Sequence, residues 1–97
     1  MKKIEEIKKI LEEHKEELQD RYKIKKIGIF GSYIRNEQKA ESDVDILVEF
    51  EEVPDLIEFV DLKNYLSELL NVKVDLVMKS VLKPNIGKRI LKEVVYI

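Results

Sequence analysis

Two aspartates separated by a single residue are the clearest candidates for chemistry in this sequence. Asp43 and Asp45 begin Asp43–Phe50, a run rich in β-branched and apolar residues that predicts a strand. Residues i and i+2 of a strand point to the same face, about 6.6 Å apart. Carboxylates so placed repel each other unless a cation lies between them, and Mg²⁺ prefers such oxygen ligands. Asp43 and Asp45 are therefore candidate Mg²⁺ ligands; the alternative is that one caps a turn and the other is solvated.

A third carboxylate, Asp75, lies in a later run, Val72–Val77, that alternates apolar and polar residues and also predicts a strand. A carboxylate in the middle of an apolar strand is costly to bury unless it is paired or bound to a metal. Asp75 is therefore a candidate third metal ligand and catalytic group. The alternative is an aspartate on an edge strand that faces water.

Gly31-Ser32 follows a short apolar run and precedes a predicted helical segment. Glycine has no Cβ, so the backbone can turn sharply there and a ligand can approach closely. Free N–H groups at a helix start favour a phosphate, and the Ser32 hydroxyl adds a donor. A phosphate-binding turn is one interpretation, and a plain turn is the other.

The elements that must position these residues follow from hydrophobic periodicity and turn signals. The pattern predicts, in order, a helix over Ile4–Tyr22, a strand over Ile24–Phe30, one or two helical turns over Ser32–Gln38, the strand Asp43–Phe50, a helix from Asp55 to about Asn71, the strand Val72–Val77, a helix over Ile86–Glu93, and a strand or tail over Val94–Ile97. Asp55 and Glu58 have the spacing of a capping box. The helix that they begin is expected to bury one face, made of Leu56, Phe59, Val60, Leu66 and Leu70.

Strands and helices in this order predict an α/β (α+β) fold, a small mixed β-sheet with helices packed on it. The length of 97 residues predicts one domain, residues 1–97. The absence of cysteine excludes disulfides and thiolate chemistry, and the net charge of −2 argues against direct nucleic-acid binding. No apolar run is long enough to span a membrane, and the N-terminus does not read as a signal peptide, so a cytoplasmic protein is expected.

Taken together, Gly31-Ser32, Asp43-Val44-Asp45 and Asp75 closely resemble the nucleotidyltransferase superfamily related to DNA polymerase β. Within it the chain is similar to the minimal nucleotidyltransferases (MNT), the antitoxins of HEPN/MNT toxin–antitoxin pairs. The resemblance covers nearly the whole chain, including its end, Arg89–Ile97. It implies a polymerase β-like nucleotidyltransferase core.

The resemblance also implies roles for single residues. Gly31 and Ser32 would hold the β- and γ-phosphates, and Arg35 matches an arginine that is common after this Gly-Ser. Asp43 and Asp45 would ligate Mg²⁺. Asp75 would help to bind a second Mg²⁺ and act on the acceptor hydroxyl.

The family often has small residues between Ser32 and Arg35 and a glycine after the arginine. This chain has Tyr33, Ile34 and Asn36 there. Asparagine tolerates a left-handed backbone better than most residues, so the turn is expected to persist.

The function that the resemblance implies is an antitoxin that acts as an ATP- and Mg²⁺-dependent protein adenylyltransferase, transferring AMP to a tyrosine hydroxyl of a cognate HEPN toxin. A chain this short has no room for a separate acceptor-binding domain, so a partner must present the hydroxyl. Two Mg²⁺ ions would stabilise the attacking and leaving oxygens of the displacement. The alternatives are a non-catalytic antitoxin that neutralises the toxin by binding, and transfer to a nucleic acid or small molecule.

Three other features have structural interpretations. His14, the only histidine, falls on the apolar side of the first predicted helix and is expected to be packed there. Arg35 is either a triphosphate contact or a surface ion-pair partner of Glu37 or Glu41. Near the C-terminus a locally basic stretch with one acid, Glu93, is expected to be a solvated surface, or to guide a triphosphate or an acidic partner: Lys79, Lys83, Lys88, Arg89 and Lys92.

Overall fold

The computed structural model describes residues 3–97. Its elements are α1 (Ile4–Glu13), α2 (Lys15–Tyr22), β1 (Ile24–Phe30), the 3-10 turn η1 (Gly31–Tyr33), β2 (Val44–Phe50), α3 (Leu56–Leu70), β3 (Val74–Met78), the 3-10 turn η2 (Lys79–Val81), α4 (Pro84–Glu93) and β4 (Val95–Tyr96). None of the helices in this part of the chain combines the length and apolar composition that a membrane crossing requires.

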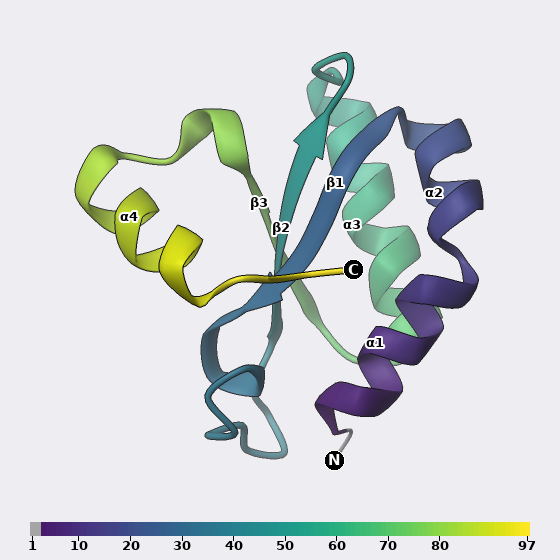
Figure 1. Ribbon diagram of the computed structural model, residues 1–97. Helices are drawn as coiled ribbons and strands as arrows, with labels where there is room; N and C mark the ends of the chain where they lie inside the picture. The colour runs from purple at the N-terminus through teal and green to yellow at the C-terminus, as the bar shows by residue number, and fades with distance from the viewer. Residues whose placement is uncertain (1–2) are drawn as a thin grey trace.

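The sheet is mixed, with the strand order β3-β2-β1-β4 (Figure 1). β1 pairs antiparallel with β2 and with β4, whereas β2 pairs parallel with β3. Helices α1, α2 and α3 cover one face, and α4 lies on the other side of the strands. The predicted fold class, a small mixed sheet with helices packed on it, is confirmed.

The core lies between the sheet and α1–α3. Its fully buried side chains alternate along β2, where Val44, Ile46 and Val48 face the helices. Helices α1 and α2 contribute Ile7, Leu11 and Leu18. Because alternate residues of a strand face opposite sides, the residues between those of β2 are turned to the side of α4.

The first predicted helix is wrong in one respect, because it is interrupted at His14. The backbone leaves the helical region there, with φ −107° and ψ 6°. The Nδ1 of His14 hydrogen-bonds to the Ile10 carbonyl at 2.9 Å, a bond that competes with the helix ladder. His14 is half-buried at this break, so its structural interpretation fits.

The predicted buried face of α3 is also partly wrong. Leu62, Leu66 and Leu70 are fully buried, whereas Leu56 and Val60 are 77% and 44% exposed. In the first turns of α3 only Phe59 of the predicted face packs against the core. The capping box is confirmed: Asp55 accepts from the Glu58 N–H at 2.8 Å, and Glu58 accepts from the Asp55 N–H at 3.4 Å.

Strand boundaries differ by one or two residues from the expected ones. Asp43 directly precedes β2, and β3 begins at Val74 because Asn71 ends α3 in a left-handed conformation, with φ 52°. The last residues form a strand, since Val95 pairs with Ile29 in β1.

Candidate active site

Three aspartates lie on one face of the sheet. Asp45 in β2 is flanked by Val44 and Ile46, which both face the core, so its side chain is turned to the opposite face. Asp75 lies between two core residues of β3 and points the same way for the same reason. Asp43, two residues before Asp45, follows the same alternation.

Parallel pairing of β2 and β3 brings Asp45 and Asp75 together. The two residues are direct partners in the register, and neighbouring strands lie about 4.8 Å apart. Asp45 is half-buried and Asp75 is exposed. Asp75 is thus an exposed aspartate on an edge strand, as the alternative interpretation expected. The strand pairing also places it next to the half-buried Asp45.

Asp45 carries the electrostatic consequence of this arrangement. Its pKa is raised to about 6, first by burial and then by the charges of Asp75 and Asp43 and a hydrogen bond with Asp75. The positive charge of Arg35 acts in the opposite direction. All three aspartates and Arg35 are therefore close enough to interact.

Gly31 ends β1 next to Asp45. Its φ of +79° lies in the region that favours glycine, and a Cβ at this position would fall 2.0 Å from Oδ2 of Asp45. No other residue fits there without displacing the carboxylate. The sequence predicts that a ligand approaches Gly31 closely; in the structure the group that approaches it is the carboxylate of Asp45.

The turn that follows Gly31 presents Ser32 and buries Tyr33. Ser32 is half-buried, whereas Tyr33 is 1% exposed and packs in the core. The Ile34 and Arg35 N–H groups both donate to the Gly31 carbonyl at 3.1 Å, which closes the turn. Asn36 adopts φ 57°, so the left-handed position expected of this asparagine is present.

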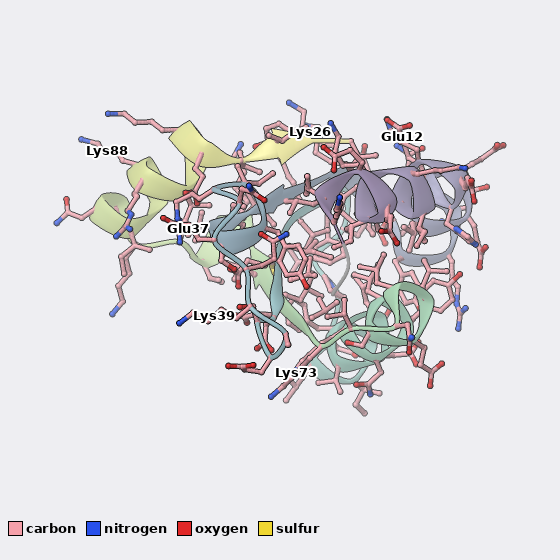
Figure 2. All side chains as sticks on the ribbon, turned by 90° about the horizontal axis from the view of Figure 1, so that it is seen from below. Glu12, Lys26, Glu37, Lys39, Lys73 and Lys88 are labelled. Carbon is pink, nitrogen blue, oxygen red and sulfur yellow. The ribbon has the colours of Figure 1, made fainter. Side chains whose placement is uncertain are left out.

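Arg35 forms ion pairs on the surface of this turn. Its Nε donates to Glu37 at 2.7 Å and its Nη1 donates to Glu93 at 2.5 Å. Figure 2 shows Glu37 on the side of its loop that faces α4, which carries Glu93. Of the two interpretations of Arg35, the ion pair with Glu37 is present. The positive charge of the guanidinium also acts to lower the pKa of Asp45.

Glu93 is a site residue that sequence reasoning missed. Its second oxygen accepts the Gly31 N–H at 2.8 Å, so the N–H of Gly31 is already engaged within the chain. Burial raises the pKa of Glu93, but the bonds from Gly31 and Arg35 outweigh burial and lower the pKa overall. In the sequence, the one feature that could have indicated Glu93 is that it is the single acid in a basic stretch.

The basic side chains of this stretch are not all directed to the site. Lys88, in the same helix as Glu93, extends away from the sheet (Figure 2).

The carboxylate oxygens of the three aspartates are the kind of ligand that Mg²⁺ prefers. Within residues 3–97, no three His, Cys, Asp or Glu side chains already converge as a metal cage. Magnesium, however, is commonly held by one or two carboxylates, with water and substrate phosphates completing its coordination. The mutual repulsion that raises the pKa of Asp45 is what a divalent cation would relieve. The chemistry of these carboxylates is therefore compatible with Mg²⁺ held by one or two of them.

Comparisons with known proteins show which family the chain resembles. The family model of the nucleotidyltransferase domain matches residues 11–97. Protein adenylyltransferase MntA from Thermococcus cleftensis is 56% identical over 94 residues, covering 97% of this chain and 95% of that protein.

Two solved structures share the fold. One, described as a minimal nucleotidyltransferase, aligns with a TM-score of 0.75 at 32% identity and covers 92% of this chain and 93% of its own. A chain of a toxin–antitoxin complex with AMP-PNP aligns with a TM-score of 0.73 at 26% identity, covering 88% of this chain and 70% of that one. With a family match over most of its length and a relative at 56% identity, this chain belongs to the nucleotidyltransferase domain family and is a nucleotidyltransferase.

Proposed function

We propose that this chain is an antitoxin that transfers AMP from ATP, with Mg²⁺, to a tyrosine hydroxyl of a cognate HEPN toxin and thereby silences it. The observation that carries the proposal is the pairing of Asp45 with Asp75 on the open face of the sheet, beside Gly31. The relative from Thermococcus cleftensis is named as a protein adenylyltransferase, and a similar fold occurs in a toxin–antitoxin complex with an ATP analogue.

The residue roles follow from position and exposure. Ser32 and Arg35 lie on the turn beside the aspartates and would bind the triphosphate. Gly31 would contribute to that binding by leaving room for the Asp45 carboxylate beside the triphosphate, since its own N–H is taken by Glu93. Asp43 and Asp45 would hold Mg²⁺, which when bound neutralises charge on the triphosphate and on the reacting oxygens.

Asp75 would serve the acceptor. It is exposed, so a hydroxyl on a second protein can reach its carboxylate. We assign it the hydroxyl proton and a share in a second Mg²⁺. The hydroxyl oxygen forms a bond to the α-phosphorus, the bond from that phosphorus to the β-phosphate bridging oxygen breaks, and pyrophosphate leaves.

The remaining parts of the proposal concern the whole chain. Residues 1–97 would act as a single domain, with the toxin as the partner that supplies the acceptor. Because the reaction would consume ATP, we propose a cytoplasmic location for the pair.

Mass spectrometry of the toxin after incubation with ATP and Mg²⁺ tests this function. We expect the toxin to gain the mass of AMP on a tyrosine. Asp43→Asn and Asp45→Asn should each reduce labelling by at least about 100-fold, because each removes a metal ligand. Glu41→Gln, an exposed charge removal in the same loop, is the matched control and should label normally.

Neutralisation in cells separates catalysis from binding. If the Asp43→Asn and Asp45→Asn variants still protect cells from the toxin, the chain acts by association and the catalytic proposal is wrong.

A further inference from the structure

The carboxylate of Glu93 joins two parts of the site that are far apart in sequence. Its Oε2 accepts the Gly31 N–H at 2.8 Å, and its Oε1 accepts Nη1 of Arg35 at 2.5 Å. These partners lie 62 and 58 positions before it. The Glu93 side chain is 18% exposed, against 63% for Glu37, the other partner of Arg35. Glu93 is thus the better shielded anchor of the two.

The backbone that carries Glu93 is attached to the sheet. Glu93 ends α4, and two residues later Val95 pairs with Ile29 of β1. The same strand, β1, leads directly into Gly31. The carboxylate and the turn that it binds are therefore both held by β1, so their relative position does not depend on a flexible loop.

The two groups that donate hydrogen bonds to Glu93, Gly31 and Arg35, both belong to the candidate active site. Gly31 packs against the Asp45 carboxylate, and the charge of Arg35 acts on Asp45. Glu93 therefore bonds to two groups that adjoin Asp45, and these bonds lower the pKa of Glu93 although burial acts to raise it.

We propose that Glu93 is a positioning residue for the nucleotide, which holds Arg35 and the Gly31 turn in the arrangement that receives the triphosphate. An arginine side chain has many rotamers, and a group already held in place loses less entropy when its ligand binds. Nε and Nη1 of Arg35 are engaged by Glu37 and Glu93, which leaves the Nη2 edge of the guanidinium for a phosphate. This role for Glu93 rests on the proposed function only in naming ATP as the ligand.

A double-mutant cycle between Glu93 and Arg35 tests the proposal. Glu93→Gln should weaken binding of the Mg²⁺ complex of AMP-PNP and raise the KM for ATP by about 5- to 10-fold, with kcat changed less than about 2-fold. Arg35→Gln should weaken binding at least as much. The double variant should lose less than the product of the two single losses, because Glu93 acts in part through Arg35. Independent, multiplying losses would overturn the proposal.

Two further variants separate charge from packing. Glu93→Asp keeps the charge but withdraws the carboxylate by one methylene, so binding should fall between that of the wild type and Glu93→Gln. Glu37→Gln removes a partner of Arg35 that does not touch Gly31 and should weaken binding less than Glu93→Gln. Glu41→Gln should bind like the wild type. An equal loss in Glu37→Gln and Glu93→Gln would contradict the assignment to Glu93.

NMR without nucleotide makes the test independent of the reaction. In Glu93→Gln, the Arg35 Nε–Hε and Gly31 amide signals should shift, and the heteronuclear NOE of Arg35 Nε–Hε should fall. Unchanged signals would overturn the proposal even if activity fell. If these signals change but the wild type neither binds AMP-PNP nor labels the toxin, Glu93 holds the turn as stated and the proposed function is what fails.

Discussion

Asp45 lies between two other carboxylates, Asp43 in its own segment and Asp75 on the neighbouring strand. Burial, followed by the charges of Asp75 and Asp43, raises its pKa from 3.8 to about 6. For an acid whose pKa is raised in the folded state, the stabilising contribution is present below the unfolded value and is lost as the pH rises through the folded value. Asp45 therefore weakens the cation-free fold between about pH 4 and 6 and stays unfavourable at neutral pH.

Replacing this carboxylate should stabilise the metal-free protein. We expect Asp45→Asn to raise the free energy of unfolding at pH 7.5 in EDTA by about 1 kcal/mol after solvent screening, or Tm by about 4–8 °C. At pH 4 the gain should shrink, since Asp45 is then largely protonated in the wild type. Thermal unfolding followed by circular dichroism measures both. Glu41→Gln controls for net charge, and an equal gain at the two pH values would contradict the role of ionisation.

Among the elements, α3 connects the two strands that carry the aspartates. It begins with the Asp55–Glu58 capping box and ends at the left-handed Asn71. Near its end, Ser67 accepts the Val74 N–H at 3.2 Å through Oγ and donates to the Lys63 carbonyl at 2.9 Å. The end of α3 is thereby bonded to the first residue of β3, one position before Asp75. The helix sets where β3 begins.

Removing the cap of α3 should cost a measurable part of its stability. Asp55→Ala leaves the Glu58 N–H without its side-chain acceptor, so we expect the free energy of unfolding to fall by about 1 kcal/mol. Urea denaturation measures this value. Glu52→Ala removes an exposed acid three residues earlier and should change it by less than about 0.5 kcal/mol. Equal effects of the two changes would mean that the cap contributes nothing.

At the scale of the whole molecule, the end of the chain completes the sheet beside β1. Ile97 donates its N–H to the Ile27 carbonyl at 2.9 Å, and Tyr96 pairs with Gly28. The two strands approach closely at Gly28, where a Cβ would lie 2.7 Å from Val94 Cγ2 and 3.0 Å from the Val95 carbonyl oxygen. The absence of a side chain at Gly28 therefore lets the C-terminal segment dock, and this segment carries Glu93.

A methyl group at Gly28 should displace β4. Gly28→Ala meets a backbone oxygen that has little room to move, so we expect a loss of about 1–3 kcal/mol in the free energy of unfolding. Faster hydrogen exchange at the Ile97 amide should accompany it. Gly87→Ala is the matched control: its Cβ would lie 3.2 Å from Leu82, in a helix where alanine is favoured, so its effect should be small. Unchanged exchange at Ile97 in Gly28→Ala would contradict the close contact.

Local patterns in the sequence were sufficient to predict most helices and strands and the face of the sheet on which each aspartate lies. Strand alternation alone turns Asp45 and Asp75 away from core residues, and the capping box predicts where α3 begins. Apolar periodicity did not show the break at His14, because a polar residue at the edge of an apolar stripe does not by itself reveal a side-chain bond to the backbone.

The tertiary structure alone decided which strands are neighbours. The order β3-β2-β1-β4 pairs Asp45 with Asp75 across 30 positions of sequence, and the return of the chain to β1 places Glu93 against Gly31 and Arg35. A residue pattern records which side chains share a face, since that depends on local backbone geometry. Strand order depends on the free energy of burying whole faces against each other, and no local spacing encodes it.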